Sequence, residues 1–332
     1  MKVSVLMTTY NQEGLIAQAI ESALMQEVNF DYEIVIGEDA STDRTREIVL
    51  GFQERNPEKV RVRLRDPIDA ERDRAAGVGG KRGFVNGLQA CTGQYVALLD
   101  GDDYWTDVHK LQRQVDFLDS HLDFAICCHN VKMVYDDGSK EPVNLMPSDH
   151  KEAWTLEDLL LANVIPTCST VFRRGLFGEL PDWFFELKLG DWPIHIMNAQ
   201  HGKIGYINEV MAVYRVHEGG FWSTWSPVSQ GLELIKMLHH VDAYLGFKYK
   251  KQIRRAQAKW YWELVHLCYR DGDRISAREY MKKYFWLGGF RERRNLLSFI
   301  LRLRTPTLYH ALRSIKEFVR SVTSHNPGVI GS

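Results

Sequence analysis

The feature that most constrains this chain is an alternation of two hydrophobic periods along its first hundred residues. Short apolar runs, typical of strands buried on both faces, are separated by segments in which apolar residues recur at helical spacing. Strands that alternate with helices predict an α/β fold, with a mostly parallel central sheet and helices on both of its faces. The expected strands are Val3–Thr8, Tyr32–Gly37, Val60–Leu64 and Tyr95–Leu99.

The segments between and after these strands predict the remaining elements. One helix begins near Leu15, a second is capped by Ser41 or Thr42, and a short third one occupies Phe84–Cys91 after a polar, glycine-rich stretch. Beyond the sheet, the expected elements are a helix over Trp105–Asp119, a strand over Phe124–Tyr135, a turn over Asp136–Ser139, helices over 155–161 and 191–200, and a short pair of strands over 204–207 and 210–216.

Charge divides the chain into two parts. The 332 residues carry a formal net charge of −1, but residues 1–227 hold 22 Lys and Arg against 35 Asp and Glu, whereas residues 228–332 hold 20 against 8. The basic part has an almost wholly helical pattern, with a last helix expected to start at Thr305 and Pro306. We therefore expect an α/β domain over 1–226, a basic helical region over 227–325 and a flexible tail over 326–332.

Composition excludes several classes of protein. With 45% apolar and 26% charged residues, the chain is globular rather than disordered. Its five cysteines include no CxxC pair and support neither a disulfide framework nor a zinc ribbon. No apolar stretch reaches the ~18 residues of a membrane span, and the first residues lack the features of a signal peptide. We therefore expect a cytoplasmic protein.

Polar side chains follow three of the expected strands. The first strand runs into Thr8, Thr9 and Tyr10, the second into Asp39, and the fourth into Asp100–Asp103. Ligands of open α/β sheets bind beyond the carboxyl ends of the strands. We therefore expect these side chains to form one site at one edge of the sheet.

The sequence Asp100-Gly101-Asp102-Asp103 is the strongest local signal. Three carboxylates within four residues repel one another, so directly after a buried strand they lower stability unless a cation or hydrogen-bond donors compensate them. Oxygen ligands of this kind suit Mg²⁺ or Mn²⁺, which also bridge the phosphates of a nucleotide. A solvated acidic turn with Gly101 at its bend explains the tetrapeptide alone equally well.

A nucleotide would need further groups that read its base and balance its charge. Asp39, with Thr9 and Tyr10, could hydrogen-bond a pyrimidine base and stack beside it, and Lys81 and Arg82 could reach the base or the phosphates. The glycines around Lys81 do not form a P-loop, and no GxGxxG follows the first strand. The sequence therefore disfavours both an ATPase and a Rossmann dehydrogenase.

Three blocks of sequence together resemble the signature of family 2 glycosyltransferases. They are Val3–Asn11, Glu38–Asp43 and Ala97–Trp105, in the family's order and spacing. The resemblance covers about residues 1–225 and implies the GT-A fold, which is Rossmann-like. It implies an inverting, metal-dependent transferase of hexosyl groups that uses a nucleotide diphosphate sugar, with UDP favoured. The QxxRW motif of processive members is absent, so we expect an enzyme that adds single sugars.

The resemblance also implies roles for individual residues. Asp39 matches the contact to uracil or an equivalent base, and the aspartates after the fourth strand match the DxD region. Which aspartate is the main metal ligand stays open, with Asp102 favoured. The residues implied to bind the nucleotide sugar are Thr8, Thr9, Tyr10, Asp39, Lys81, Arg82, Asp100 and Asp102. Those implied to bind Mn²⁺ or Mg²⁺ are Asp102, Asp103 and His217.

A second group of implied residues lies further along the chain. Asp191 opens an expected helix where the family carries its catalytic base, and a helix N-terminus stabilises an ionised carboxyl group. Gly190 departs from the Glu that usually precedes this base. Tyr214–His217 resembles the loop that closes over the diphosphate, and Gly219–Trp222 suits a lid or a platform on which a sugar stacks. An ordinary first-turn acid and a structural histidine are the alternatives for Asp191 and His217 taken alone.

Other functions and partners are weighed on the same sequence. A metal-dependent phosphatase also uses Asp-x-Asp, but after its first strand and followed by Thr, and a scaffold built on a glycosyltransferase-like domain is the non-catalytic alternative. The basic C-terminal helices suit contact with an anionic membrane surface, with a saccharide or lipid-linked acceptor, or with a second copy in a homo-oligomer. No nucleic acid is expected, because no recognised module appears. We expect an enzyme of cell-surface polysaccharide or glycolipid synthesis, in the cytoplasm or at the inner face of the membrane.

Overall fold

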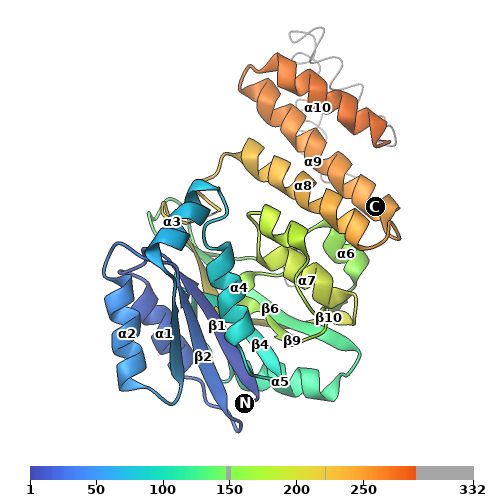
Figure 1. Ribbon diagram of the computed structural model, residues 1–332. Helices are drawn as coiled ribbons and strands as arrows, with labels where there is room; N and C mark the ends of the chain where they lie inside the picture. The colour runs from blue at the N-terminus through green and yellow to red at the C-terminus, as the bar shows by residue number, and fades with distance from the viewer. Residues whose placement is uncertain (147–150, 221, 289–332) are drawn as a thin grey trace, which may run out of the picture.

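The centre of the protein is a mixed β-sheet with the strand order β3-β2-β1-β4-β9-β6-β10-β5. The computed structural model describes residues 1–146, 151–220 and 222–288, and Figure 1 shows the sheet between two layers of helices. The first four strands are parallel, as the sequence predicts. They are β1 (Val3–Thr9), β2 (Tyr32–Glu38), β3 (Val60–Leu64) and β4 (Tyr95–Asp100).

The second half of the sheet contains antiparallel strands. The short strand β9 (Val171–Arg173) lies antiparallel between β4 and β6 (Phe124–Tyr135). The long strand β10 (Lys203–Val216) runs parallel to β6 and ends at the edge that holds the carboxyl ends of β1, β2 and β4. Three two-residue strands pair antiparallel with β10 or β6: β5 (Tyr104–Trp105), β7 (Val143–Asn144) and β8 (Ala153–Trp154).

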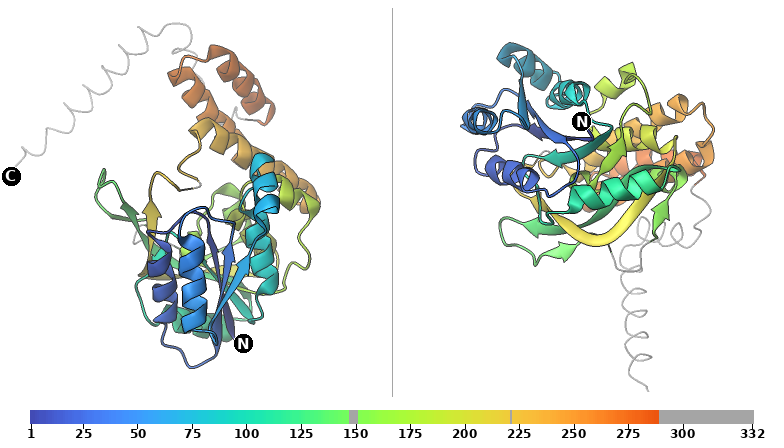
Figure 2. Two further views of the ribbon diagram at one scale, coloured as in Figure 1. Left: turned by 60° about the vertical axis from the view of Figure 1, so that its left-hand side comes forward. Right: turned by 90° about the horizontal axis from the view of Figure 1, so that it is seen from below.

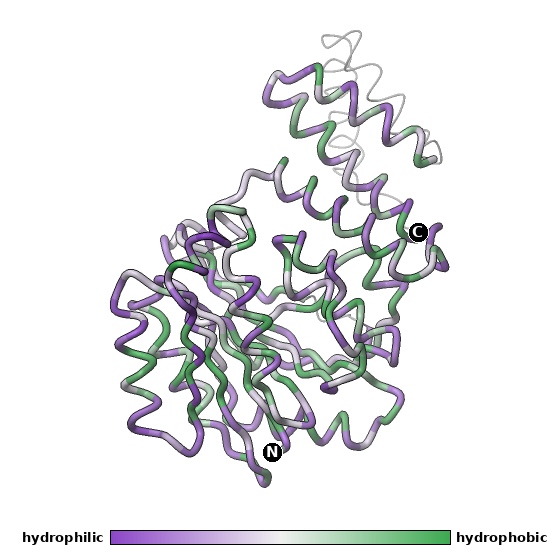
Figure 3. Tube along the Cα trace, viewed as in Figure 1, coloured by the Kyte–Doolittle hydropathy of each residue, from purple (hydrophilic) through white to green (hydrophobic). Residues whose placement is uncertain are grey.

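Helices cover both faces of the sheet, as the sequence predicts, because successive side chains of the strands point to opposite sides. In β1, Val3, Val5 and Met7 join a core with α1 (Ile16–Leu24), α2 (Thr45–Arg55) and α5 (Lys110–Ser120). Leu6 of β1 joins the opposite core with α4 (Lys81–Ala90), α6 (Leu156–Leu161) and α7 (Asp191–Ala199). Figure 2 shows the two helical layers from other sides, and Figure 3 shows hydrophobic residues along the central strands.

Four local expectations are wrong. The helix expected from Trp105 begins at Lys110, because Trp105 belongs to β5. The two strands expected over 204–216 are one strand, β10, with bulges after Ile207. The polar stretch after β3 contains α3 (Pro67–Ala75), which is capped by the side chain of Asp66. Helix α2 begins at Thr45 without a side-chain cap, so neither Ser41 nor Thr42 caps it.

The described part of the C-terminal region, up to residue 288, contains three helices, as expected. They are α8 (Pro227–Tyr244), α9 (Lys250–Arg270) and α10 (Arg274–Trp286). Buried residues of α8 and of the first part of α9 share the core of α6 and α7. The rest of α9 and α10 form a small core of their own and project from the body in Figures 1 and 2. The helix expected from Thr305 and the tail over 326–332 lie outside the described residues.

None of the helices in the described part of the chain is both long enough and apolar enough to cross a lipid bilayer.

Candidate active site

The polar ends of three strands meet at one edge of the sheet. Thr8 of β1 lies beside Asp100 of β4, and Thr9 lies beside Glu38 of β2. The backbone N–H of Asp39 donates to the carbonyl oxygen of Thr9 at 3.0 Å, and the N–H of Gly101 donates to that of Thr8 at 2.9 Å. The register of β1 with its two neighbours therefore brings Asp39 and the Asp100–Asp103 segment to the same edge.

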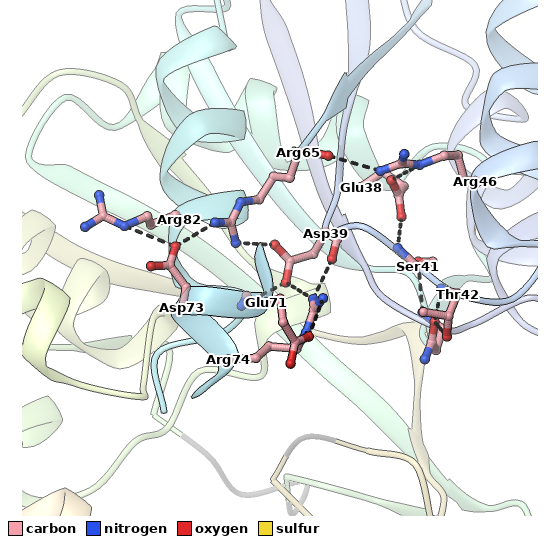
Figure 4. A network of polar contacts seen from close by, with 12 residues as sticks. Glu38, Asp39, Ser41, Thr42, Arg46, Arg65, Glu71, Asp73, Arg74 and Arg82 are labelled. Carbon is pink, nitrogen blue, oxygen red and sulfur yellow. Dashed lines mark hydrogen bonds and ion pairs between the residues drawn. The ribbon is translucent and has the colours of Figure 1, made fainter. Parts of the chain in front are cut away.

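Asp39 is the centre of a network of arginines and carboxylates, which Figure 4 shows. Its side chain is 6% exposed, and its Oδ1 accepts a hydrogen bond from Nη1 of Arg65 at 2.6 Å. The other guanidinium nitrogen of Arg65 lies 2.6 Å from Oδ2 of Asp73 on α3. Oδ2 of Asp39 accepts from the backbone N–H of Gly80 at 3.1 Å. Asp39, the carboxylate expected to contact the nucleotide base, is thus held in place by Arg65, and the guanidinium group compensates its charge.

Two glycines allow α4 to lie directly against the end of β2. A Cβ atom on Gly37 would come within 2.9 Å of the carbonyl oxygen of Gly83. A Cβ atom on Gly83 would come within 3.1 Å of Oδ1 of Asp39. Both distances are shorter than an ordinary contact, so a side chain at either position would push the first turn of α4 away from Asp39.

Tyr10 lies on the exposed side of the Asp39 network. The guanidinium carbon of Arg74 lies 4.6 Å from the centre of the Tyr10 ring, within the range of a cation–π contact. Nη1 of Arg74 also donates to the carbonyl oxygen of Asp39 at 2.9 Å. Arg82 lies at the other side of the network, with its Nε 3.2 Å from Oδ2 of Asp73. Arginines therefore surround the place where a nucleotide base is expected.

The aspartates after β4 have different surroundings. Oδ1 of Asp100 accepts a hydrogen bond from Oγ1 of Thr8 at 2.6 Å. Burial and the charge of Asp102 raise the pKa of Asp100 to about 7. Asp103 is 1% exposed, its Oδ1 accepts from the backbone N–H of Arg215 at 2.9 Å, and burial raises its pKa well above the ordinary value. Close carboxylates without a cation between them dominate the electrostatics of this segment.

Asp102 and His217 lie next to each other, and both side chains are partly exposed. Nε2 of His217 is 3.1 Å from Oδ2 of Asp102, and this contact raises the pKa of His217. His217 directly follows β10, and its carbonyl oxygen accepts from Oγ of Ser223 at 2.8 Å. Arg215 holds the same segment, because its Nη1 donates to the carbonyl oxygen of Asp102 at 3.1 Å. Phe221, part of the expected lid, lies outside the described residues.

The donor atoms of this segment suit a hard divalent cation. Asp102 offers carboxylate oxygens and His217 an imidazole nitrogen, which are ligands of Mn²⁺. The negative charge of the segment has no lysine or arginine ion pair among the contacts of the described residues, apart from the hydrogen bonds of Arg215. Within 1–146, 151–220 and 222–288, however, no three His, Cys, Asp or Glu side chains are already arranged around a metal position. The side chains of Asp102 and His217 are in contact, whereas Oδ1 of Asp103 already accepts a hydrogen bond from the backbone N–H of Arg215.

Asp191 faces the same region from another element. It is the first residue of α7, is partly exposed, and its Oδ2 accepts from Oγ1 of Thr167 at 3.1 Å. Thr167 belongs to the 3₁₀ helix Thr167–Ser169, which is followed by Thr170, and the carbonyl oxygen of Thr170 accepts from the backbone N–H of Leu98 on β4 at 3.0 Å. The charge of Asp191 also contributes to the raised pKa of Asp100. The start of α7 therefore brings Asp191 toward the aspartates that follow β4, although Asp191 lies 91 residues after Asp100 in the chain.

Lys81 occupies a place that the sequence does not indicate. Its side chain is buried, and its Nζ donates to the carbonyl oxygen of Leu189, two residues before Asp191. The same Nζ lies 4.1 Å from the centre of the Phe184 ring. Burial lowers the pKa of Lys81 to about 7, against the opposing charges of Asp191 and Glu233. The side chain expected to reach the donor is thus engaged with the segment that leads into α7.

Sequence reasoning missed three further residues of the site. Arg65 directly follows β3 and could have been found by the same strand-end argument as Asp39. Asp73 is on α3, which the pair Asp66-Pro67 signals as a cap followed by a first-turn proline. His195, one turn after Asp191, is fully buried, and neither ring nitrogen has a hydrogen-bond partner among the described residues. No sequence signal marks it.

Comparison with known proteins relates this site to one family. The model of "Glycosyl transferase family 2" matches residues 4–180. A protein of Mycobacterium tuberculosis without an assigned function is 35% identical over 221 residues, which are 66% of this chain and 60% of that relative. A glycosyltransferase of Nostoc is 32% identical over 233 residues, 65% of each chain. This chain thus spans about 60% of the length of its mycobacterial relative.

Proteins with known substrates are more distant. The poly(ribitol-phosphate) β-N-acetylglucosaminyltransferase TarS of Staphylococcus aureus is 27% identical over 201 residues, 60% of this chain and 32% of TarS. The structure of TarS 1–349 with UDP superposes with a TM-score of 0.60 at 17% identity, covering 99% of this chain and 94% of that one. A mannosyltransferase of Pyrobaculum calidifontis with GDP-Man and Mn²⁺ gives 0.51 at 16% identity, covering 98% and 86%. These structures share the GT-A fold of this chain.

Proposed function

This chain belongs to glycosyltransferase family 2, and from that premise we propose that it transfers one sugar from a nucleotide diphosphate sugar to a hydroxyl acceptor, with inversion at the anomeric carbon. The observation that carries the proposal is the meeting of Asp191 with the aspartates after β4, at the sheet edge where Asp39 is fixed. This arrangement supplies a base, a place for a cation and a reader of the nucleotide base within one site.

The donor is bound at the strand ends. Asp39 accepts a hydrogen bond from the base, whose ring lies beside Tyr10, and Thr8 and Thr9 line the pocket between Asp39 and Asp100. Arg82 and Lys81 were both expected at the donor, and Arg82 is the more exposed of the two. UDP is the favoured carrier, since the structure of TarS with UDP superposes with a TM-score of 0.60, against 0.51 for the Pyrobaculum enzyme with GDP-Man.

Asp102, Asp103 and His217, with Asp100 beside them, would hold a divalent cation, Mn²⁺ or Mg²⁺, which would stabilise the charge of the leaving diphosphate when bound. Asp102 and His217 need little movement to share such an ion, because their ligand atoms are 3.1 Å apart. Asp103 would have to release the N–H of Arg215 to join them. Asp102 is therefore the main ligand of the three.

Asp191 is the general base. Its Oδ2 is oriented by Thr167, and its other oxygen takes the proton of the acceptor hydroxyl. The acceptor oxygen forms a bond to the anomeric carbon from the side opposite the diphosphate. The bond from that carbon to the phosphate oxygen breaks, and its electron pair leaves with the diphosphate. Direct displacement of this kind inverts the configuration at the anomeric carbon.

The acceptor is a saccharide or a lipid-linked saccharide of the cell surface. Relatives named for poly(ribitol-phosphate) glycosylation and for teichuronic acid biosynthesis support this class. We place the enzyme in the cytoplasm at the inner face of the membrane, where such acceptors are assembled. A non-catalytic scaffold on the same fold would bind no nucleotide sugar, which separates the two proposals.

The test begins with binding of UDP-, GDP- and dTDP-sugars, measured by calorimetry with and without Mn²⁺. Transfer of the best donor is then compared between the wild type and Asp191→Asn. The variant should keep donor affinity and lose about 10²–10⁴-fold in kcat, the usual contribution of a positioned base. Asp182→Asn, an exposed aspartate near the start of the same segment, is the matched control. Normal turnover of the Asp191 variant would remove Asp191 from the mechanism, and no binding of any donor would favour the scaffold.

A basic patch with exposed aromatic rings supports the proposed membrane contact. Trp286 at the end of α10 is 78% exposed, and Phe247 before α9 is 58% exposed. The guanidinium of Arg254 lies against Trp286, and Nζ of Lys250 lies near Phe247. The exposed lysines and arginine of this patch are Lys248, Lys250, Lys251, Arg255, Lys282 and Lys283. Cations beside exposed rings are typical of surfaces that bind anionic lipid headgroups.

Sedimentation with vesicles tests this contact. The protein should bind vesicles that contain anionic phosphatidylglycerol and ignore vesicles of neutral phosphatidylcholine. The double variant Phe247→Ser and Trp286→Ser should weaken binding severalfold, whereas Ile275→Ser, equally exposed at the other end of α10, should not. Equal binding of the double variant and the wild type would refute the contact.

A further inference from the structure

Lys81 contacts the segment of the chain that precedes Asp191. Helix α4 begins at Lys81, and its ammonium lies against the carbonyl oxygen of Leu189 and over the ring of Phe184. The next residue repeats the arrangement, because the guanidinium of Arg82 lies 5.6 Å from the centre of the Phe185 ring. Two successive cations at the start of α4 thus contact two successive phenylalanines of the 3₁₀ helix Asp182–Glu186.

Burial of the Lys81 ammonium group lowers the stability of the fold, so we expect this side chain to have a function that compensates for the loss. The side chain is 4% exposed, and no ion pair of the described residues includes it. Burial of an ammonium group without a paired carboxylate disfavours the charged form, so its pKa falls to about 7. The charged groups that face it are Asp191 and Glu233, and the remaining contacts are the carbonyl oxygen of Leu189 and an aromatic ring. A lysine that only filled space would be replaced by an apolar residue at lower cost.

The segment that Lys81 contacts needs an external support. Gly190 separates Leu189 from Asp191, and a glycine leaves the backbone before the helix free to adopt many conformations. A Cβ atom on Gly190 would lie 3.7 Å from Nζ of Lys81 and 4.0 Å from Cδ1 of Phe84. Lys81 therefore fills the space beside Gly190 and holds the peptide that directs Asp191 into the site.

We propose that Lys81 is a positioning residue for Asp191: from the first turn of α4 it holds the Leu189–Gly190 peptide and so fixes the carboxylate that removes the proton from the acceptor. This inference rests on the proposed role of Asp191. It differs from the sequence-based expectation that Lys81 binds the donor. A displacement of about 1 Å of a catalytic group can cost on the order of 10²-fold in rate, so loss of this support should be visible in kcat.

Lys81→Met tests the inference, since methionine keeps the length and the contact with Phe184 but removes the charge and the hydrogen bond. We expect kcat to fall about 10–100-fold, with donor affinity and the KM for the acceptor within about twofold of the wild type. Lys59→Met is the matched control, because Nζ of Lys59 lies 4.6 Å over the ring of Tyr32, away from the site. That control should change no kinetic constant.

A second variant separates positioning from general damage to the fold. Gly190→Ala meets only ordinary contacts and restricts the backbone before Asp191. Combined with Lys81→Met, it should recover kcat severalfold, because it restores part of the lost restraint. A fall in donor affinity of tenfold or more in Lys81→Met, with kcat unchanged, would overturn the inference in favour of the donor role.

Hydrogen exchange gives a measurement that does not depend on turnover. The amides of Leu187–Asp191 should exchange faster in Lys81→Met than in the wild type, while those of β1 and β4 stay unchanged. Unchanged exchange over Leu187–Asp191 would overturn the inference even if the enzyme is active. If no donor and acceptor pair supports transfer by the wild type, the proposed function fails, and the exchange experiment still decides whether Lys81 holds this segment.

Discussion

The carboxyl ends of β2 and β4 are both acidic in sequence, but they differ in how the charge of their carboxylates is balanced. At the end of β2, Glu38 lies 2.7 Å from Arg46 and Asp39 lies 2.6 Å from Arg65. At the end of β4, burial and mutual repulsion raise the pKa of Asp100 and Asp103, and among the described residues His217 is the basic side chain that contacts the carboxyl group of Asp102.

The difference separates carboxylates that arginines of this chain neutralise, at the end of β2, from carboxylates at the end of β4 that have no arginine or lysine ion pair among the described residues. A carboxylate that is already paired, such as Asp39, can still accept a hydrogen bond from an uncharged ring and does not attract a metal strongly. Close, unpaired carboxylates repel one another unless a proton or a cation neutralises them. Under the proposed function, the end of β2 would therefore receive the nucleotide base, and the end of β4 the ion that accompanies the diphosphate.

Arg65→Met removes the ion-pair partner of Asp39 at the end of β2 and has the largest expected effect. Removal of the guanidinium leaves Asp39 and Asp73 buried without their partner, and breaking such a pair costs about 3–5 kcal/mol of unfolding free energy. Urea denaturation followed by circular dichroism measures the loss. Arg63→Met, exposed on β3, which Arg65 directly follows, should change the unfolding free energy by less than about 0.5 kcal/mol. Equal stability of the two variants would mean that the ion pairs at β2 do not hold the site together.

Asp102→Asn removes one carboxylate from the segment after β4. It should leave the unfolding free energy nearly unchanged while it lowers activity. We expect Mn²⁺-dependent donor binding to be lost and kcat/KM to fall about 10²–10³-fold, as for removal of one group that stabilises developing charge. Calorimetry with and without Mn²⁺ and a transfer assay measure these changes. Asp137→Asn, in the exposed hairpin turn after β6, is the control. Metal-dependent donor binding by the Asp102 variant at wild-type strength would exclude this end as the cation site.

Glu33→Gln gives a smaller, pH-dependent effect at a paired carboxylate of β2. Burial raises the pKa of Glu33, but hydrogen bonds from Ser4 and Thr92 and the charge of Arg61 outweigh it, so the pKa is lowered. A lowered pKa means that Glu33 stabilises the fold above the pKa of the unfolded chain, and that this stability is lost as the pH falls through the folded value. The variant should lose about 1–2 kcal/mol at pH 7 and much less at pH 3. A loss that does not change with pH would show that the charge of Glu33 contributes nothing.

Much of the fold could be predicted from the sequence because it depends on local patterns. The four parallel strands and the helices between them follow from hydrophobic periods. The bulge in β10 could not be predicted, because exposed Asn208 and Glu209 look like a turn between two strands. The antiparallel strand β9 has only three residues, and its place between β4 and β6 is set by long-range packing.

The site was predictable to a similar degree. The convergence of Asp39 and Asp100 on one edge follows from the rule for strand ends in parallel sheets. The contact of Lys81 with Leu189 was not predictable, since a basic residue in a glycine-rich stretch gives no information on a partner 108 residues away. His195 shows the same limit, because its burial depends on how α7 packs against the sheet.

The close approach of Gly37 and Gly83 has a consequence for how such a site can evolve. The contact between the end of β2 and α4 accepts no additional methyl group without displacement, so a side chain at neither position could reshape the proposed site of the nucleotide base. Exchange of one nucleotide carrier for another must therefore arise at residues with freedom to vary, such as Tyr10 and Arg74. Descendants of this chain would change their donor through a stacked pair at the rim while the two glycines stay as they are.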